Sequence, residues 1–332
     1  MALTLTSSIS TYGYGAAMLT HYLDICLNSS VSVHSVSIKV QASPHAVVNC
    51  LFLPTPVVTL CDDDDESYIF SEGAPNSPQG CAIKIERSDT MSTVLILGSE
   101  DKVNAISVQI RSKLPIVLSY IRWVHSGDGS SVSLPIDTSN LPRAEFYAST
   151  KSAMGRDLSN LESYWNDYLA SSSNVLLMIG PPGTGKTSFL RGMICHSQSS
   201  AMVTFDTTLL QADKVFASFM AGNTRFMILE DCDSFLTKRT QGNTVMHKFL
   251  NVGDGLISTS TKKLVFTTNL PNVSSIDPAL TRVGRCYDVL KFDALSAEQC
   301  QVITGRPETE SRTLAELMTQ CQSAPVQKAV GF

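Results

Sequence analysis

The chain has 332 residues, of which 43% are hydrophobic and 17% are charged, and its formal net charge is −5. This composition is that of a globular protein, and the length suggests two domains. Residues 1–140 contain 7 Lys and Arg against 13 Asp and Glu. The first part of the chain therefore lacks the broad basic field expected of a protein that grips a nucleic-acid backbone.

The nine cysteines are scattered, and none forms a C-x-x-C pair. This pattern is typical of reduced thiols in the core of a cytosolic protein. No apolar run approaches the 18 or so residues of a membrane helix, and the first residues lack the basic start of a signal peptide. We therefore expect a cytoplasmic protein without a membrane partner, in the host cytoplasm if the source is viral.

Residues 1–140 are predicted to form a mixed α/β, strand-rich domain that binds a partner or supports assembly. Helical spacing of apolar residues occurs at 16–28 and 101–113, and strand-like runs occur at 31–40, 46–53, 56–60, 81–87, 93–98 and 116–124. Five successive acids at 62–66 could suggest a metal site. Because like charges repel and cannot all face one ion, a solvated loop is the better interpretation.

A Pro-, Ser- and Thr-containing segment at 141–156 is predicted to be a linker, and a helix is expected at 157–169. From residue 174 the pattern alternates between strands and helices. The expected strands are 174–179, 201–205, 225–229, 263–268 and 287–292, and the expected helices are 186–196, 208–220, 244–251 and 275–281. Near-continuous apolar strands separated by helices indicate a parallel sheet covered on both faces.

The segment Gly180–Thr187, with the sequence Gly-Pro-Pro-Gly-Thr-Gly-Lys-Thr, lies between a predicted strand and a predicted helix. In this context G-x-x-x-x-G-K-[ST] indicates a phosphate-binding loop. Glycines let backbone N–H groups turn inward around an anion, and the helix N-terminus adds its positive dipole end. Lys186 would reach the β- and γ-phosphates, and the Thr187 hydroxyl would hold Mg²⁺. The loop therefore predicts a nucleoside triphosphate and Mg²⁺ as ligands.

A second group of polar residues follows the strand at 225–229, where the sequence continues with Glu230 and Asp231. A phosphate loop needs one carboxylate at a neighbouring strand end for Mg²⁺ and a second one to orient the attacking water. Glu230 and Asp231 fit these two roles. Asn269 ends the strand at 263–268 and could hydrogen-bond the γ-phosphate or the water.

Two arginines, Arg282 and Arg285, precede the last strand of the predicted core. An arginine supplied by a neighbouring subunit can stabilise charge on a phosphoryl group during its transfer.

These motifs resemble those of AAA+ ATPases, and they occur along the chain in the same order as in that family. The resemblance rests on the phosphate loop, Leu-Glu-Asp-Cys-Asp at 229–233, Leu-Asn-Val-Gly-Asp-Gly-Leu at 250–256, Thr-Thr-Asn at 267–269 and Asp-Pro-Ala-Leu-x-Arg-x-Gly-Arg at 277–285. The pattern is similar to the AAA branch with the second region of homology. It implies a P-loop core with a five-stranded parallel sheet at 157–294, a lid at 295–332, a ring that is usually hexameric, and ATP bound between subunits.

The resemblance also assigns roles to the site residues. Walker A comprises the nucleotide-binding residues Pro182, Gly183, Thr184, Gly185, Lys186, Thr187 and Ser188. Glu230 and Asp231 match Walker B, and Thr187 and Glu230 would hold the metal. Asn269 matches sensor 1, and Arg282 and Arg285 match arginine fingers that act on the neighbouring subunit.

Three features depart from the common AAA pattern. The acidic pair is Glu then Asp, an order that resembles the mitochondrial Rieske-protein translocase group and related ATPases of bacteriophages. The segment 205–216 lacks an aromatic–hydrophobic–Gly pore loop, which argues against threading of an unfolded polypeptide. The lid is short, because only 40 residues follow Phe292.

The leading hypothesis is a ring-forming ATP hydrolase that remodels or translocates a protein partner. One alternative is a nucleic-acid-handling AAA+ loader or replication factor. Another is an assembly scaffold. In that case ATP binding would order the ring, and hydrolysis would be slow.

Overall fold

The computed structural model describes most of the chain after residue 33. The described residues are 34–51, 58–62, 65–72, 81–88, 90–125, 131–138, 141–204, 207–211, 213–236, 246–254, 261–270 and 276–323. The chain divides into two compact units. The first unit comprises Met1–Leu118 and Val132–Pro135, and the second comprises Ser119–Ser131 and Ile136–Phe332. The predicted helix at 16–28 lies outside the described residues. The expected domain boundaries after residues 140, 156 and 294 stay predictions.

The first unit contains an antiparallel sheet with the strand order β1-β5-β4-β3-β2. Its strands are β1 (His34–Val40), β2 (Val58–Asp62), β3 (Asp65–Glu72), β4 (Cys81–Ser88) and β5 (Met91–Gly98). Alternation of apolar and polar residues along β1 and β5 places one face toward α2 (Pro44–Leu51) and α3 (Glu100–Lys113). The core between them contains Ile38, Val40, Ile83, Ile85, Val94, Ile96, Val103 and Ile110.

The strand predicted at 46–53 was wrong, because this segment lies mostly in helix α2. Val47 and Leu51 are buried one helical turn apart, and the Ser43 hydroxyl accepts a hydrogen bond from the N–H of Ala46 at 3.2 Å. A short apolar run does not distinguish a strand from a buried helix by its periodicity. Of the five acids that were interpreted as a loop, Asp62 ends β2, and Asp65 and Glu66 begin β3, with Asp62 paired to Asp65; residues 63 and 64 lie outside the described residues.

The larger sheet is mostly parallel, has the strand order β7-β6-β10-β11-β12-β9-β13-β8, and belongs to the second unit except for Val132–Pro135 of β7. Its five central strands are β9 (Val175–Ile179), β10 (Ser200–Val203), β11 (Phe226–Leu229), β12 (Lys263–Thr268) and β13 (Cys286–Lys291). They run parallel to one another and coincide with the five predicted strands, so the predicted α/β class is confirmed. β6 (Tyr120–Val124) pairs in parallel with β10, and the two edge strands are β7 (Ser131–Pro135) and β8 (Lys151–Ser152).

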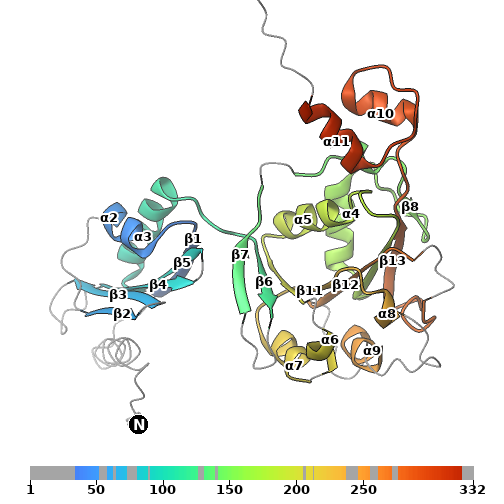
Figure 1. Cartoon of the computed structure of the whole chain (residues 1–332). Helices are drawn as coiled ribbons and strands as arrows, with labels where there is room; N and C mark the ends of the chain where they lie inside the picture. Colours follow the sequence, from blue (N-terminus) through green and yellow to red (C-terminus); the bar gives the residue numbers. More distant parts are fainter. Residues whose placement is uncertain are drawn as a thin grey trace, which may run out of the picture. The chain divides into compact units, whose positions relative to one another are not determined.

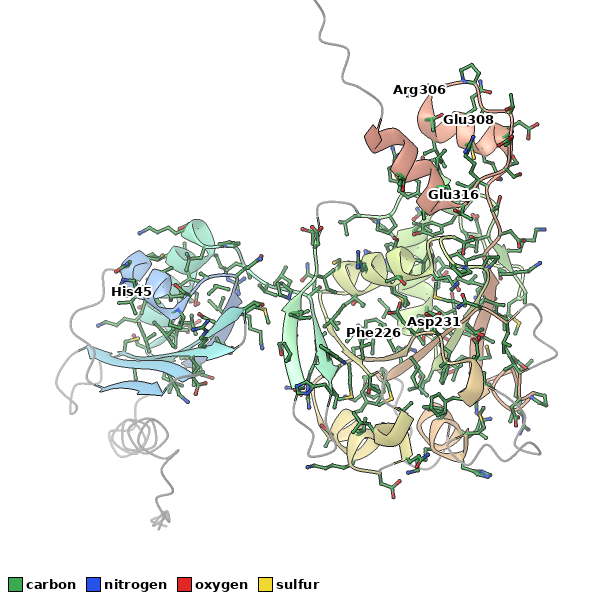
Figure 2. All side chains as sticks on the ribbon, viewed as in Figure 1. His45, Phe226, Asp231, Arg306, Glu308 and Glu316 are labelled. Atoms are coloured by element: carbon green, nitrogen blue, oxygen red, sulfur yellow. The ribbon has the colours of Figure 1, made fainter. Side chains whose placement is uncertain are left out.

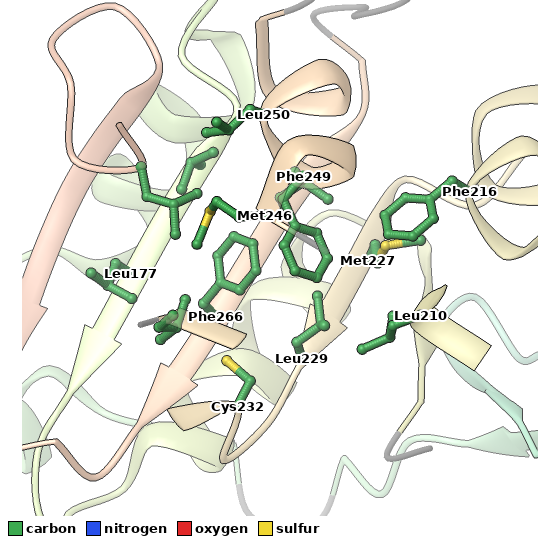
Figure 3. Close-up of a cluster of buried hydrophobic side chains, with 14 of the residues drawn as sticks. Leu177, Leu210, Phe216, Met227, Leu229, Cys232, Met246, Phe249, Leu250 and Phe266 are labelled. Atoms are coloured by element: carbon green, nitrogen blue, oxygen red, sulfur yellow. The ribbon is translucent and has the colours of Figure 1, made fainter. Parts of the chain in front are cut away.

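Helices cover both faces of this sheet (Figure 1). The first face packs against α4 (Leu161–Ala170) and α5 (Lys186–His196), through a cluster that includes Trp165 and Phe189. The second face packs against α6 (Thr207–Gln211), α7 (Asp213–Ala221) and α9 (Met246–Asp254). Figure 3 shows this second cluster, in which Phe216, Phe249 and Phe266 form a chain of edge-to-face aromatic contacts.

The lid consists of α10 (Ala297–Thr304) and α11 (Leu314–Ser323), where two helices were expected. A capping box between Ser296 and Gln299 begins α10, and Gly305 ends it in the left-handed conformation. Leu295, Cys300, Leu314 and Leu317 form the small core of the lid.

The helix expected at 208–220 corresponds to α6 and α7, between which residue 212 lies outside the described residues. Another predicted helix differs from the structure. The helix expected near 275–281 is absent from residues 276–281, which form a turn. In this turn the backbone N–H of Ala279 donates to the side chain of Asp277, and the backbone N–H of Leu280 donates to the carbonyl of Asp277. Asp commonly makes such turns in competition with helix. In the described part of the chain, we find no helix with the length and apolar character needed to cross a membrane.

Candidate active site

A pocket of about 850 Å³ lies in the second unit, where the parallel strands β9, β11 and β12 end. All seven predicted Walker A residues, from Pro182 to Ser188, line it. Glu230, Asp231 and Asn269 join them from the ends of the neighbouring strands β11 and β12. Figure 2 labels Asp231 here and Glu316 on the lid helix α11. The fold therefore brings together the first three groups of predicted site residues.

The loop before α5 needs glycine for two separate reasons. At Gly180, a Cβ atom would lie 2.3 Å from the carbonyl oxygen of Phe292, so no side chain fits there. Gly185 is the N-cap of α5 with a φ of 97°, a conformation that glycine adopts at little cost. Because Lys186 is the first residue of α5, the loop leads directly into the helix N-terminus, where free N–H groups favour an anion.

Lys186 is buried beside this loop and already lies among acceptors. Its ammonium donates to the carbonyls of Gly180 and Pro181, and to Oδ1 of Asn269 at 3.0 Å. Burial lowers the pKa of the ammonium, and the opposing charges of Asp231, Asp233 and Glu230 raise it. Burial has the larger effect, so the pKa of Lys186 lies below its ordinary value.

The two acids after β11 have different partners. Oε1 of Glu230 accepts the hydroxyl of Thr187 at 2.7 Å, so these two oxygen ligands form a pair suited to a hard cation. Oδ1 of Asp231 accepts the amide of Asn269 at 3.0 Å. Asp231 also has a φ of 49°, a left-handed conformation that Asp tolerates better than most residues. The two acids thus lie in different environments, and their roles as a metal ligand and an orienting base stay predictions.

Asp233 is a residue whose role the sequence reasoning missed. Its Oδ1 accepts the hydroxyl of Thr268 and, at 3.2 Å, the backbone N–H of Asn269. It therefore fixes the strand end that carries Asn269. The sequence did contain a sign of this role, because Asp233 is the third acid in the stretch Leu229–Asp233 and follows Asp231 by two residues.

Arg282 and Arg285 lie at the opposite end of the sheet. The carbonyl of Arg285 accepts the N–H of Val175, the first residue of β9, whereas the phosphate loop follows the last residue of β9. Five strand residues at about 3.3 Å each separate the two positions by about 16 Å. Arg282 is exposed, and the guanidinium of Arg285 donates to the carbonyl of Ala279. Within one chain, the arginines and the pocket are not brought together.

An apolar wall of the pocket comes from the segment that was predicted to be a linker. Leu141, Pro142 and Phe146 line this wall, and the Arg143 guanidinium lies 4.6 Å from the centre of the Phe146 ring. Leu314, Ala315 and Met318 of the lid contribute further apolar surface. No sequence motif marked these residues. An apolar slot beside an anion cradle fits the base and the phosphates of a nucleotide, and the Thr187–Glu230 pair fits its Mg²⁺.

Comparisons with known proteins agree with this geometry. Residues 176–294 match the model of the ATPase family associated with various cellular activities, AAA. The chain is 26% identical over 136 residues to 26S proteasome regulatory subunit 8 of Caenorhabditis elegans, covering 36% of this chain and 32% of the relative. It is 32% identical over 159 residues to 26S proteasome regulatory subunit 6A of Schizosaccharomyces pombe, covering 42% of this chain and 34% of the relative. A putative cell division cycle ATPase of Plasmodium falciparum is 29% identical over 129 residues, covering 35% of this chain and 10% of the relative.

The chain thus spans about a third of the length of the proteasome subunits that it matches. The matched region contains the phosphate loop, both acids after β11, Asn269 and both arginines. Residues 176–294 are therefore an AAA ATPase domain, a kind of domain that implies ATP binding and hydrolysis, with distant similarity to 26S proteasome regulatory subunits.

Proposed function

We propose that this chain is a ring-forming ATP hydrolase whose active site is completed by a second copy. The observation behind this proposal is the position of Arg282 and Arg285 at the end of the sheet opposite the phosphate loop. An arginine that stabilises phosphoryl transfer must reach the transferred group. Since β9 separates the two groups within one chain, the arginines of a neighbouring copy are the ones that can enter the pocket. The resemblance favours a ring of six.

The phosphate loop, the two acids after β11 and Asn269 then each have a task. The backbone N–H groups from Gly183 to Thr187 and the Lys186 ammonium bind the phosphates. Thr187 and Glu230 hold Mg²⁺, which neutralises charge on the phosphate oxygens when bound. Asp231 orients the attacking water and accepts its proton, and Asn269 keeps Asp231 in place through their hydrogen bond.

The biological partner we propose is a protein that the acidic N-terminal part recognises. Residues 1–140 carry a net charge of −6 from 7 basic and 13 acidic residues, which disfavours a nucleic-acid backbone. The Glu230–Asp231 order resembles the Rieske-protein translocase group. Together with the absence of an aromatic–hydrophobic–Gly sequence in 205–216, this favours remodelling or translocation without pore-loop threading.

The test measures ATP turnover and particle size on the same preparation. With Mg²⁺ and ATP we expect phosphate release, and with a non-hydrolysable analogue we expect closed rings in electron micrographs and a matching mass by light scattering. Rings without turnover would favour the ATP-ordered scaffold. Turnover stimulated by DNA in a salt-dependent way would favour the nucleic-acid loader. A monomer that hydrolyses ATP at full rate would contradict the shared site.

A further inference from the structure

Lys263, the first residue of β12, is fully buried, although its neighbours along this strand are apolar or uncharged. Its ammonium donates to the carbonyl of Ser171 at 2.6 Å and lies 3.5 Å from the carbonyl of Ser173 and from Oδ1 of Asn174. All three acceptors belong to residues 171–174, the loop between α4 and β9. We call this segment the α4–β9 loop. Lys263 therefore fixes the α4–β9 loop from inside the second unit.

The other side of the α4–β9 loop contacts the turn that carries the two arginines. The Ser173 hydroxyl donates to the carbonyl of Gly284 at 3.0 Å. Directly after the loop, the N–H of Val175 donates to the carbonyl of Arg285 at 3.0 Å. Gly284 itself has a φ of 90° and lies between Arg282 and Arg285. The α4–β9 loop thus contacts Lys263 on one side and the turn that carries Arg282 and Arg285 on the other.

The energetics indicate that Lys263 has a positional role. A buried ammonium costs free energy unless it is well hydrogen-bonded, and an apolar residue at this position would avoid that cost. Burial, with a smaller contribution from the charge of Arg225, lowers the pKa of Lys263 to about 8. The Tyr168 ring lies 5.0 Å from the ammonium, and the Tyr168 hydroxyl donates to the carbonyl of Asn174 at 2.8 Å. Two independent side chains therefore hold the same loop.

We propose that Lys263, acting through Ser173 of the α4–β9 loop, is a positioning residue that aims the Arg282–Arg285 turn at the active site of the neighbouring copy. This inference rests on the proposed function, in which the arginines act between subunits. Lys263 and Ser173 lie at the end of the sheet away from the pocket of their own chain, so their loss should impair a neighbour and leave their own ATP binding intact.

The first experiment removes one hydrogen bond with little effect on packing, because Ser173 is only partly buried. Ser173→Ala should lower kcat severalfold, while KM and the affinity for a fluorescent ATP analogue stay at wild-type values. Ser173→Thr keeps the hydroxyl and should restore kcat. Equal kcat for Ser173→Ala and wild type would overturn the proposal.

The second experiment uses the adjacent lysine as a matched control. Lys263→Met should lower kcat more than Ser173→Ala does. Lys262 is also buried, but its ammonium donates to the carbonyls of Gly222 and Thr224, away from the α4–β9 loop. Lys262→Met should therefore keep wild-type kcat. Similar losses in both variants would contradict a specific role of Lys263, and if Lys263→Met does not fold, Ser173→Ala decides.

Mixing separates positioning from general damage. Lys186→Ala subunits should bind ATP weakly and lack turnover but keep intact arginines, whereas Lys263→Met subunits keep an intact pocket. Their mixture should hydrolyse ATP faster than either variant alone. No gain on mixing would overturn the proposal. Full turnover of Arg282→Ala would instead show that the proposed function itself is wrong.

Discussion

The two ends of the larger sheet use their polar residues in opposite ways. At the carboxyl end, Lys186, Glu230 and Asp231 line one pocket, and Lys186 donates a hydrogen bond to Asn269. At the amino end, Lys262 and Lys263 are buried and donate hydrogen bonds to backbone carbonyls, while Arg282 is exposed on a turn. One end is organised around a ligand and the other around the position of a surface turn.

This difference follows from a parallel sheet. All strands of the central five start at one end and finish at the other, so residues before a strand cannot meet residues that follow its neighbour. On our proposal, a site that needs both groups is formed by two copies. The largest effects of substitution are expected at the carboxyl end.

Replacing the lysine of the phosphate loop should give the largest effect. Lys186→Ala removes the cation of the pocket, so ATP affinity should fall by on the order of 10–100-fold and turnover should be lost. Equilibrium binding of a fluorescent ATP analogue and phosphate release measure both quantities.

A matched control is Lys291, an exposed lysine that pairs in register with Ile179 just before the loop. Lys291→Ala should bind and hydrolyse ATP like the wild type. Wild-type turnover in Lys186→Ala would contradict the assignment of the pocket.

Replacing the exposed arginine at the amino end should separate binding from turnover. Arg282→Ala should lower kcat by roughly 10³-fold or more, the range found when an arginine finger is lost, with unchanged ATP affinity. Arg306→Ala is the control, because Arg306 is also exposed but lies in the lid, after α10. A parallel loss of ATP affinity in Arg282→Ala would mean that the arginine acts in its own chain.

Asp233 should have an intermediate effect, because it touches Asn269 and not the pocket directly. Asp233→Ala frees the strand end that carries Asn269, and we expect kcat to fall by on the order of 10–100-fold with KM little changed. Asp233→Asn keeps an acceptor oxygen at this position and should retain most of the activity. Equal losses in the two variants would indicate that the charge of Asp233 matters more than its hydrogen bonds.

The smallest effect concerns stability at the amino end. The pKa of Lys263 is about 8 in the folded chain, below its ordinary value of 10.5, so the unfolded chain binds more protons between these two pH values. The contribution of this lysine to stability should therefore increase as the pH rises from about 8 toward 10.5. Urea unfolding of wild type and Lys263→Met across this window should give a difference in the free energy of unfolding that grows with pH. A constant difference would argue against the lowered pKa.

Much of the carboxyl end was predictable from the sequence. Strand β12 and helix α5 coincide with their predicted bounds, because their apolar periodicity is strong and glycine or polar residues mark their ends. The fold class is confirmed, and the predicted Walker A residues, both acids and Asn269 line one pocket. The chemical roles of these residues remain predictions, which the variants above test.

The remaining features have no local signature. The apolar wall at Leu141–Phe146 forms only when this segment packs beside the phosphate loop, and its composition resembled that of a linker. Likewise, a buried Lys263 cannot be recognised in a sequence where lysine is usually exposed. Both depend on contacts between segments far apart in the chain, which propensity and spacing do not encode.

The central claim is that two copies form one active site, and mixing two inactive variants tests it most directly. Lys186→Ala subunits supply intact arginines without a working pocket, and Arg282→Ala subunits supply the pocket without that arginine. The account predicts that an equimolar mixture, assembled with ATP, hydrolyses ATP well above the sum of the two separate preparations. A mixture no more active than that sum, although mixed particles have formed, would contradict a site shared between subunits.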